Sequence, residues 1–331
     1  MSWQIGRREF LKAAGAAAVG GMAPLTARSE SAVRPKARVA IATSSEHAGR
    51  KDDVPADAVN RLVDAAVASV VMASAPADAW KRLFSPGDRV AVKVNTLAGP
   101  QLSTHPSVVE AVLRGLISAG VGGDRIVVFD RSEKEMSRAG FTVGRDARGV
   151  TCTGTDAVSV GYRGELVVSG STASLWSSVI TDFATVIVNV PVLKDHDLSG
   201  VSLGMKNFFG VIHNPNKYHD NGCDPYIADV CGNRLVTGKL RLIVIDCLRA
   251  QADGGPAYRQ DGSYPYAGVI AGVDPVAVDA TGWSEIENLR KQLGYKPLKD
   301  AGREPRHILT AAERGLGVAA ADQIDAVRLP V

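Results

Sequence analysis

The sequence predicts an α/β fold in which a mostly parallel sheet carries helices on both faces, with a small β-rich insertion. Apolar runs at residues 38–43, 89–95 and 125–130 alternate with helical segments at 55–73 and 107–119. This β-α-β order is typical of a parallel sheet with helices packed on it. A further run, residues 184–193, is continuous and β-branched, as in strands that are covered on both faces.

Each predicted helix has its own local signal. In residues 55–73, Val59, Leu62, Val63 and Val70 recur at helical spacing, which predicts one buried face. In residues 107–119, Ser107 and Glu110 have the spacing of a capping box directly after Pro106, which predicts the start of the helix.

The second half of the chain continues the same alternation. Residues 131–180 are irregular, and we interpret them as a small β-rich insertion or as the edge of the sheet. The remaining predicted elements are a polar loop at 214–239, a strand at 240–245, a Gly-, Tyr- and Pro-rich loop at 250–267, a short strand at 269–271, helices at 275–292 and 305–314, and a strand at 324–329. We expect residues 38–331 to form a single domain, with two lobes as the alternative.

The amino-terminal segment predicts export. Residues 6–12 read GRREFLK, with an Arg7-Arg8 pair, and an Ala/Gly-rich apolar stretch follows. This pattern is typical of a twin-arginine signal peptide, here residues 1–27, with residues 28–37 as a linker. The apolar stretch is shorter than the roughly 20 residues that span a bilayer, so we expect no permanent membrane span. The predicted partner is the twin-arginine export machinery, and the predicted location is periplasmic or extracellular.

Composition narrows the class of protein. Hydrophobic residues make up 45% of the chain and charged residues 22%, which is ordinary for a globular protein, and the net charge is +3. The sequence contains no basic stripe of the kind that nucleic-acid binding requires. The four cysteines form no C-x-x-C pair, so the chain encodes no iron–sulfur motif. In an oxidising compartment Cys223 and Cys231 are close enough in sequence to form a disulfide across a loop.

Polar side chains gather at the ends of four predicted strands. They are Lys93 with Asn95, Asp130, the stretch from Lys194 to His213, and Asp246. In open α/β sheets ligands bind outside the carboxyl ends of the strands. We therefore expect a functional site at this edge of the sheet.

Lysines and histidines dominate these candidates. Desolvated Lys93, Lys194 and Lys206 would bind a carboxylate or phosphate, with Asn95 as a further substrate ligand. His196 or His105 would transfer protons at neutral pH. The predicted partner is therefore a small anionic molecule.

A loop with two histidines and two later carboxylates are further candidates, and each also has a structural explanation. His213 and His219 are possible metal ligands in a loop that also contains Asp220 and Asp224, although the same loop fits a polar surface turn. Asp274, before Pro275, is either the N-cap of a helix or a substrate-binding carboxylate. Asp279, one turn further on, is either an interior hydrogen-bond partner or a site carboxylate.

Together these motifs resemble the domain of unknown function 362 family, which is sometimes found in iron–sulfur proteins. The resemblance rests on VAVKVN (90–95), THP (104–106), NVPVLKDHDLSG (189–200), GMKNFFGVIH (204–213) and GVDPVAVD (272–279). The ferredoxin module that members often carry does not occur in this sequence.

The segment around His196 and Lys206 is also similar, more distantly, to the nickel-pincer lactate racemase family. That resemblance implies that His196 acts as an acid/base and that Lys206, with Asn207 beside it, anchors a cofactor or clamps the substrate. The Gly-Gly-x-Lys pattern and the metal-ligand spacing of that family are not kept here.

The sequence thus favours an exported enzyme that uses acid/base chemistry on a hydroxy acid or sugar acid. The alternatives are a non-catalytic exported binding protein and a redox accessory protein that docks onto an iron–sulfur partner. The sequence leaves the cofactor, the substrate and the oligomeric state undetermined.

Overall fold

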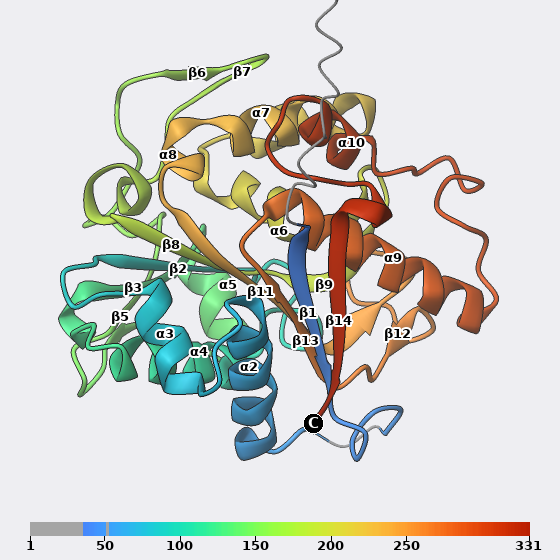
Figure 1. Cartoon of the computed structure of the whole chain (residues 1–331). Helices are drawn as coiled ribbons and strands as arrows, with labels where there is room; N and C mark the ends of the chain where they lie inside the picture. Colours follow the sequence, from blue (N-terminus) through green and yellow to red (C-terminus); the bar gives the residue numbers. More distant parts are fainter. Residues whose placement is uncertain (1–35, 51–52) are drawn as a thin grey trace, which may run out of the picture. The chain divides into compact units, whose positions relative to one another are not determined.

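A computed structural model describes residues 36–50 and 53–331, which fall in one compact unit, Lys36–Val331. At its centre is a 12-stranded sheet whose main path runs β14-β1-β13-β11-β8-β2-β3-β5-β4 (Figure 1). The strands of this sheet are β1 Ala37–Thr43, β2 Val90–Val94, β3 Ile126–Asp130, β4 Gly144–Arg145, β5 Thr151–Gly154, β8 Val186–Val190, β9 Val192–His196, β10 Gly200–Ser202, β11 Leu240–Gln251, β12 Ser263–Tyr264, β13 Gly268–Gly272 and β14 Ile324–Pro330. The predicted signal peptide and most of the predicted linker lie outside the described residues.

The central strands are parallel, as predicted. β11, β8, β2, β3 and β5 pair in parallel one after another, and β1 pairs in parallel with β14. β13 runs antiparallel to both β1 and β11. It follows β11 through residues 252–267 without a crossover helix, so the chain returns in the opposite direction.

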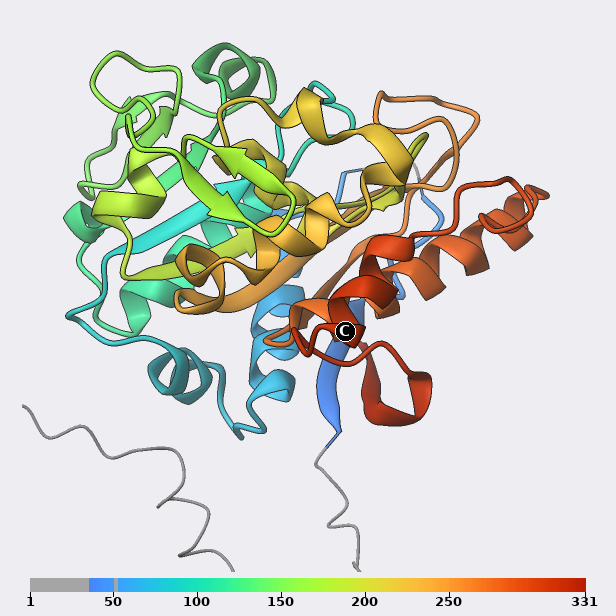
Figure 2. The same ribbon diagram turned by 90° about the horizontal axis from the view of Figure 1, so that it is seen from above.

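Helices cover both faces of the sheet, which confirms the predicted fold class. α2 Ala56–Val70, α3 Pro76–Leu83 and α4 Pro106–Ser118 lie on one face, and α6 Gly204–Asn207, α7 Tyr226–Gly232, α9 Pro275–Leu293 and α10 Arg306–Glu313 on the other (Figures 1 and 2). The other α-helices of the described chain are α5 Glu133–Arg138 and α8 Arg234–Thr237. Successive strand residues alternate between the two cores: Ala40 packs with α2, and Ile41 with the opposite layer.

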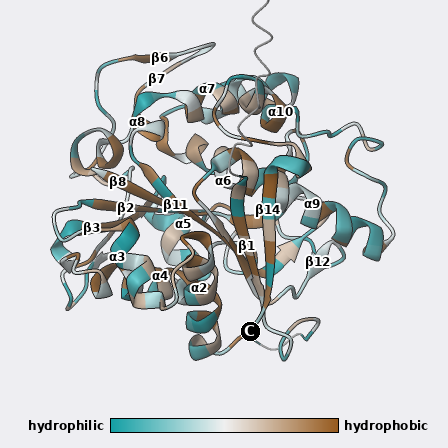
Figure 3. Cartoon of the chain, viewed as in Figure 1, coloured by the Kyte–Doolittle hydropathy of each residue, from teal (hydrophilic) through white to brown (hydrophobic). Residues whose placement is uncertain are grey.

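Hydropathy follows this layering. The central strands are largely apolar, whereas β14 at the sheet edge mixes polar and apolar residues along its length (Figure 3). The predicted apolar face of α2 is buried, with Val59, Leu62 and Val63 inaccessible to solvent. Within the described residues, no helix has the length and hydrophobicity needed to cross a bilayer.

Two local predictions need correction, and the structure resolves a third that had been left open. The N-cap of α4 is His105, whose side chain accepts a hydrogen bond from the Ser107 amide, while Glu110 pairs with Arg148 and so forms no capping box. Residues 131–180 combine both proposed arrangements, because β4 and β5 extend the main sheet and β6 Val167–Ser169 with β7 Thr172–Ser174 forms a separate hairpin. The predicted polar loop 214–239 contains α7 and α8, which bury apolar side chains.

Candidate functional site

The carboxyl ends of β2 and β9, together with α6, bring the predicted lysines into one cavity. We call it the lysine cavity; its volume is about 260 Å³. Among its lining residues are eight that the sequence analysis singled out: Lys93, Asn95, Asp130, Lys194, His196, Lys206, Asn207 and His219. Arg131 and Glu135, which the sequence patterns did not single out, line it as well.

Lys93 is held by a carboxylate. Its ammonium donates to Asp130 Oδ1 at 2.7 Å and to Asn207 Oδ1 at 3.1 Å, and the lysine is only 1% exposed. The other Asp130 oxygen accepts from the amide and the hydroxyl of Thr96, both at 2.7 Å. Burial opposes the charge on Asp130, but the adjacent Lys93 ammonium overcomes this and holds the pKa of the carboxyl below its usual value. Lys93 is therefore already neutralised within the protein.

Lys194 has no such partner. Its ammonium donates to Asn95 Oδ1 at 2.8 Å and lies 3.4 Å from the Leu102 carbonyl, and the residue is 1% exposed. None of the ion pairs formed by the described residues includes Lys194. Burial lowers its pKa to about 8.

Lys206 is the second buried amine that lacks a carboxylate partner in the described structure. Its Nζ lies 3.1 Å from His219 Nε2, 3.8 Å from Cys223 Sγ and 4.5 Å from the centre of the Phe209 ring. His219 Nδ1 lies 3.0 Å from the Pro215 carbonyl oxygen. Burial lowers the pKa of Lys206.

A buried polar network positions α6 and therefore Lys206. The Asp279 carboxylate accepts from the amides of Gly204 and Met205 at 2.8 and 2.9 Å. Asn189 Nδ2 donates to the Gly204 carbonyl, and Asn207 donates to Asn189, each at 2.7 Å. Asp279 had two possible roles from its place in the sequence, and the structure shows the first, an interior hydrogen-bond partner. Asn189 was missed, although an Asn inside an otherwise apolar strand is a signal that could have revealed it.

His196 lies in the cavity wall with a constrained imidazole. The amides of Leu198 and Ser199 donate toward Nδ1 at 3.1 and 3.4 Å, and Asp197 Oδ1 lies 2.9 Å from the same nitrogen. The amides are fixed by the backbone, whereas the Asp197 side chain is 63% exposed and free to turn to solvent. We therefore assign the Nδ1 lone pair to the amides and the ring proton to Nε2. Burial, and then Lys206 and His219, lower the pKa of His196 to about 2.

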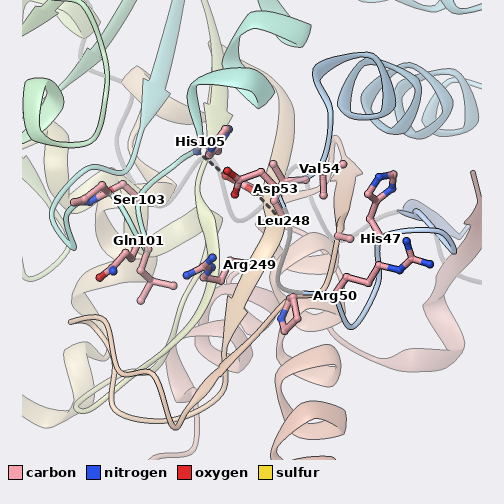
Figure 4. Close-up of a pocket in the computed structure, with 14 residues that line it drawn as sticks. His47, Arg50, Asp53, Val54, Gln101, Ser103, His105, Leu248 and Arg249 are labelled. Atoms are coloured by element: carbon pink, nitrogen blue, oxygen red, sulfur yellow. Dashed lines mark hydrogen bonds between the residues drawn. The ribbon is translucent and has the colours of Figure 1, made fainter.

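His105 lies at a different site from the one predicted. It lines a second cavity of about 290 Å³, together with Asp246, Arg249 and Ser103 (Figure 4). Asp246 accepts from the amides of His105 and Leu248 at 2.7 and 2.9 Å, and burial raises its pKa to about 6. Asp246 follows Leu242 and Val244 on the face of β11 that packs against α2 and α4, whereas Lys93 points to the opposite face. Strand alternation thus separates the two cavities.

Asp274 and His213 lie outside the lysine cavity. Asp274 caps α9, accepting from the amides of Val276 and Ala277 at 2.9 Å, which is the structural alternative to substrate binding. His213 is exposed and packs edge-to-face on Tyr162, so it does not join His219 as a metal ligand. Among the described residues, no group of three or more His, Cys, Asp or Glu side chains could hold a metal ion.

The cysteines are unpaired. All four are free and buried, so the Cys223–Cys231 disulfide that the sequence left open is not formed. Cys223 points toward Lys206, whereas Cys231 Sγ lies 3.2 Å from the Met205 carbonyl oxygen. Their buried side chains face different partners, so proximity in sequence did not predict pairing.

Comparison with known proteins identifies the family. The profile of the domain of unknown function 362 (DUF362) matches residues 90–284, more than half of the chain. The chain belongs to this family. This segment contains every residue that we place in the lysine cavity wall, from Lys93 to His219.

The other comparisons add little. A crystal structure of a protein from Thermotoga maritima is similar, with a TM-score of 0.39 and 11% sequence identity over 72% of this chain and 60% of that chain. The match therefore spans less than two thirds of that protein. No match was found among curated protein sequences.

Proposed function

We propose that this protein is an exported enzyme that uses acid/base chemistry on a small anionic substrate, such as a hydroxy acid or a sugar acid, in the lysine cavity. The observation that carries the proposal is that Lys194 and Lys206 line one cavity, are 1% and 6% exposed, and have no carboxylate partner in the described structure. Export is inferred from the twin-arginine pattern of residues 1–27.

Two buried amines without a counter-charge favour an anionic ligand. Burying an unpaired ammonium is costly, and a bound carboxylate would supply the missing charge. Asn95 and Lys93 are already engaged with protein partners, so they hold the other groups in place. The Nε2–H of His196 would donate to the same ligand.

The proton-transfer role passes from His196 to the amines in this proposal. A general base works best when its pKa is near the working pH. Of the two amines, Lys206 suits this role: burial lowers its pKa, whereas the lone pair of His196 Nδ1 is occupied and the pKa of His196 is about 2. Lys194, with a pKa of about 8, is mostly protonated at neutral pH and supplies the cation that binds the carboxylate.

Titration calorimetry with oxalate, a small dianion, tests the binding part of the proposal. We expect saturable binding to the wild-type protein and at least a roughly ten-fold weaker affinity for Lys194→Met, the equivalent of losing about 1.4 kcal/mol. The matched control is Lys217→Met, since Lys217 is exposed and does not line the cavity. Equal affinity of Lys194→Met and wild type would overturn the assignment of this site.

Hydrogen exchange tests the catalytic part. A panel of hydroxy acids and sugar acids is incubated in D₂O, and NMR follows exchange of the C–H next to the carboxylate. Exchange catalysed by wild type and by Lys217→Met, but not by Lys194→Met, is expected. Oxalate binding without exchange of any substrate would favour the non-catalytic binding protein.

A further inference from the structure

We infer that Lys206 is a nucleophile that forms an imine with the carbonyl carbon of a small 2-oxo acid, and that His219 removes and returns its proton. The inference deepens the proposed function and rests on it, because the lysine cavity is the same site. It adds a substrate class, the 2-oxo acids, and gives the two residues distinct roles.

The geometry is that of an activated nucleophile. Lys206 Nζ lies 3.1 Å from His219 Nε2, and His219 Nδ1 lies 3.0 Å from the carbonyl oxygen of Pro215. A carbonyl oxygen only accepts hydrogen bonds, so Nδ1 carries the ring proton and the Nε2 lone pair faces Lys206. A nucleophile, a base and a third group that orients the base are therefore arranged in order.

The surroundings favour a neutral amine. Lys206 is 6% exposed and packs over the Phe209 ring, and no carboxylate pairs with it in the described structure. Cys223 Sγ is 3.8 Å away, but burial raises the pKa of this thiol, which therefore stays protonated and uncharged. Burial also lowers the pKa of Lys206 and of His219, so a larger share of both is unprotonated at neutral pH.

The same cavity supplies an anchor for the acid group. Lys194 lines it, donates to Asn95 and has no carboxylate partner in the described part of the chain. His196 and Lys206 line the same cavity as Lys194. A carboxylate held by Lys194 would thus leave the adjacent carbonyl group within the cavity that Lys206 lines.

The chemistry balances without an external reagent. His219 Nε2 takes a proton from the Lys206 ammonium, and the freed amine attacks the carbonyl carbon, so that a C–N bond forms as the C=O π bond opens. A proton then passes from the added nitrogen to the oxygen, which gives the neutral carbinolamine. The protonated His219 then returns its proton to the carbinolamine oxygen. The C–O bond breaks, water leaves, and a C=N bond remains between the substrate carbon and Lys206.

Reductive trapping tests the inference on the full chain. The protein is incubated with pyruvate and sodium cyanoborohydride near neutral pH, and peptide mass analysis locates the added carboxyethyl group. Intact mass beforehand establishes that Lys206 starts unmodified. We expect the adduct on Lys206, its loss in Lys206→Arg, and trapping that is slowed by roughly 100-fold in His219→Gln, since positioned general bases contribute about that much.

Controls separate this inference from the proposed function. Lys217→Met removes an exposed lysine in the 3₁₀-helix Pro215–Tyr218, close in sequence to His219, and should trap at the wild-type rate. The imine would be overturned if wild type binds oxalate but gives no adduct, or if the adduct is spread over exposed lysines. Either result would still support the anion site. Absence of oxalate binding to wild type would overturn the proposed function itself, and an unchanged rate in His219→Gln would overturn the role of His219.

Discussion

Lys194 places a buried charge in the candidate site. Its ammonium is almost inaccessible to solvent, and its hydrogen-bond partners, Asn95 and Leu102, are both uncharged. Burial lowers its pKa from 10.5 to about 8. Keeping this amine protonated in the native state therefore lowers the free energy of unfolding. Such a loss of stability is common at binding and catalytic sites.

The pH dependence of unfolding checks that cost. Below pH 8, Lys194 is charged in both the native and the unfolded state, and its burial destabilises the protein. Between pH 8 and 10.5 the unfolded state binds more protons, so the free energy of unfolding of wild type should rise relative to Lys194→Met. At about 1.4 kcal/mol per pH unit, the gain would approach roughly 3 kcal/mol. Denaturant titrations of both proteins across this range measure it, and parallel curves would contradict the lowered pKa.

His196 supports a second prediction at the residue scale. If its Nε2–H only donates a hydrogen bond, His196→Gln should keep oxalate affinity within roughly three-fold of wild type, because an amide N–H can replace the imidazole donor. His196→Ala should weaken binding by roughly ten-fold through the lost hydrogen bond. Calorimetry compares the two variants. A complete loss of C–H exchange in a His196→Gln protein that still binds oxalate would instead assign the proton-transfer step to His196.

At the scale of elements, α6 depends on α9. Asp279 reaches from α9 to the first two amides of α6 and fixes the short helix that carries Lys206. Without the carboxylate, two buried amide groups would lack an acceptor, and each unsatisfied group costs about 1–3 kcal/mol.

Asp279→Ala should therefore lower the free energy of unfolding by about 2–4 kcal/mol and weaken oxalate binding by displacing Lys206. The matched control is Asp274→Ala in the same helix. It removes an N-cap, should cost about 1 kcal/mol, and should leave oxalate affinity unchanged because Asp274 lies outside the cavity. Denaturant unfolding and calorimetry on both variants give the answer. Weaker oxalate binding in Asp274→Ala would restore that residue to the substrate site.

At the scale of the whole molecule, stability comes from two apolar layers, one on each face of the sheet. The four cysteines are distributed through this interior as free thiols. Disulfides stabilise mainly by restricting the unfolded chain, and this chain has no such cross-link.

The melting temperature should therefore be the same with and without a thiol reductant. Mass analysis after alkylation under denaturing conditions should label all four cysteines. A melting temperature that falls on reduction, with two cysteines protected from alkylation, would show that Cys223 and Cys231 pair after all. Differential scanning calorimetry with and without reductant measures the effect directly.

The sequence by itself determined the fold class, most of the elements and the core of the candidate site. Apolar periodicity is a local property, and the carboxyl ends of parallel strands meet at one edge of the sheet. Lys93, Lys194 and the stretch to Lys206 could therefore be placed together from the sequence. Tertiary structure alone decided which lysine is paired, which way the His196 imidazole is held, and that His105 faces the other side of the sheet. Those outcomes depend on strand register, where one residue reverses the face, and on contacts between segments far apart in sequence, such as Lys93 with Asp130 and α6 with Asp279.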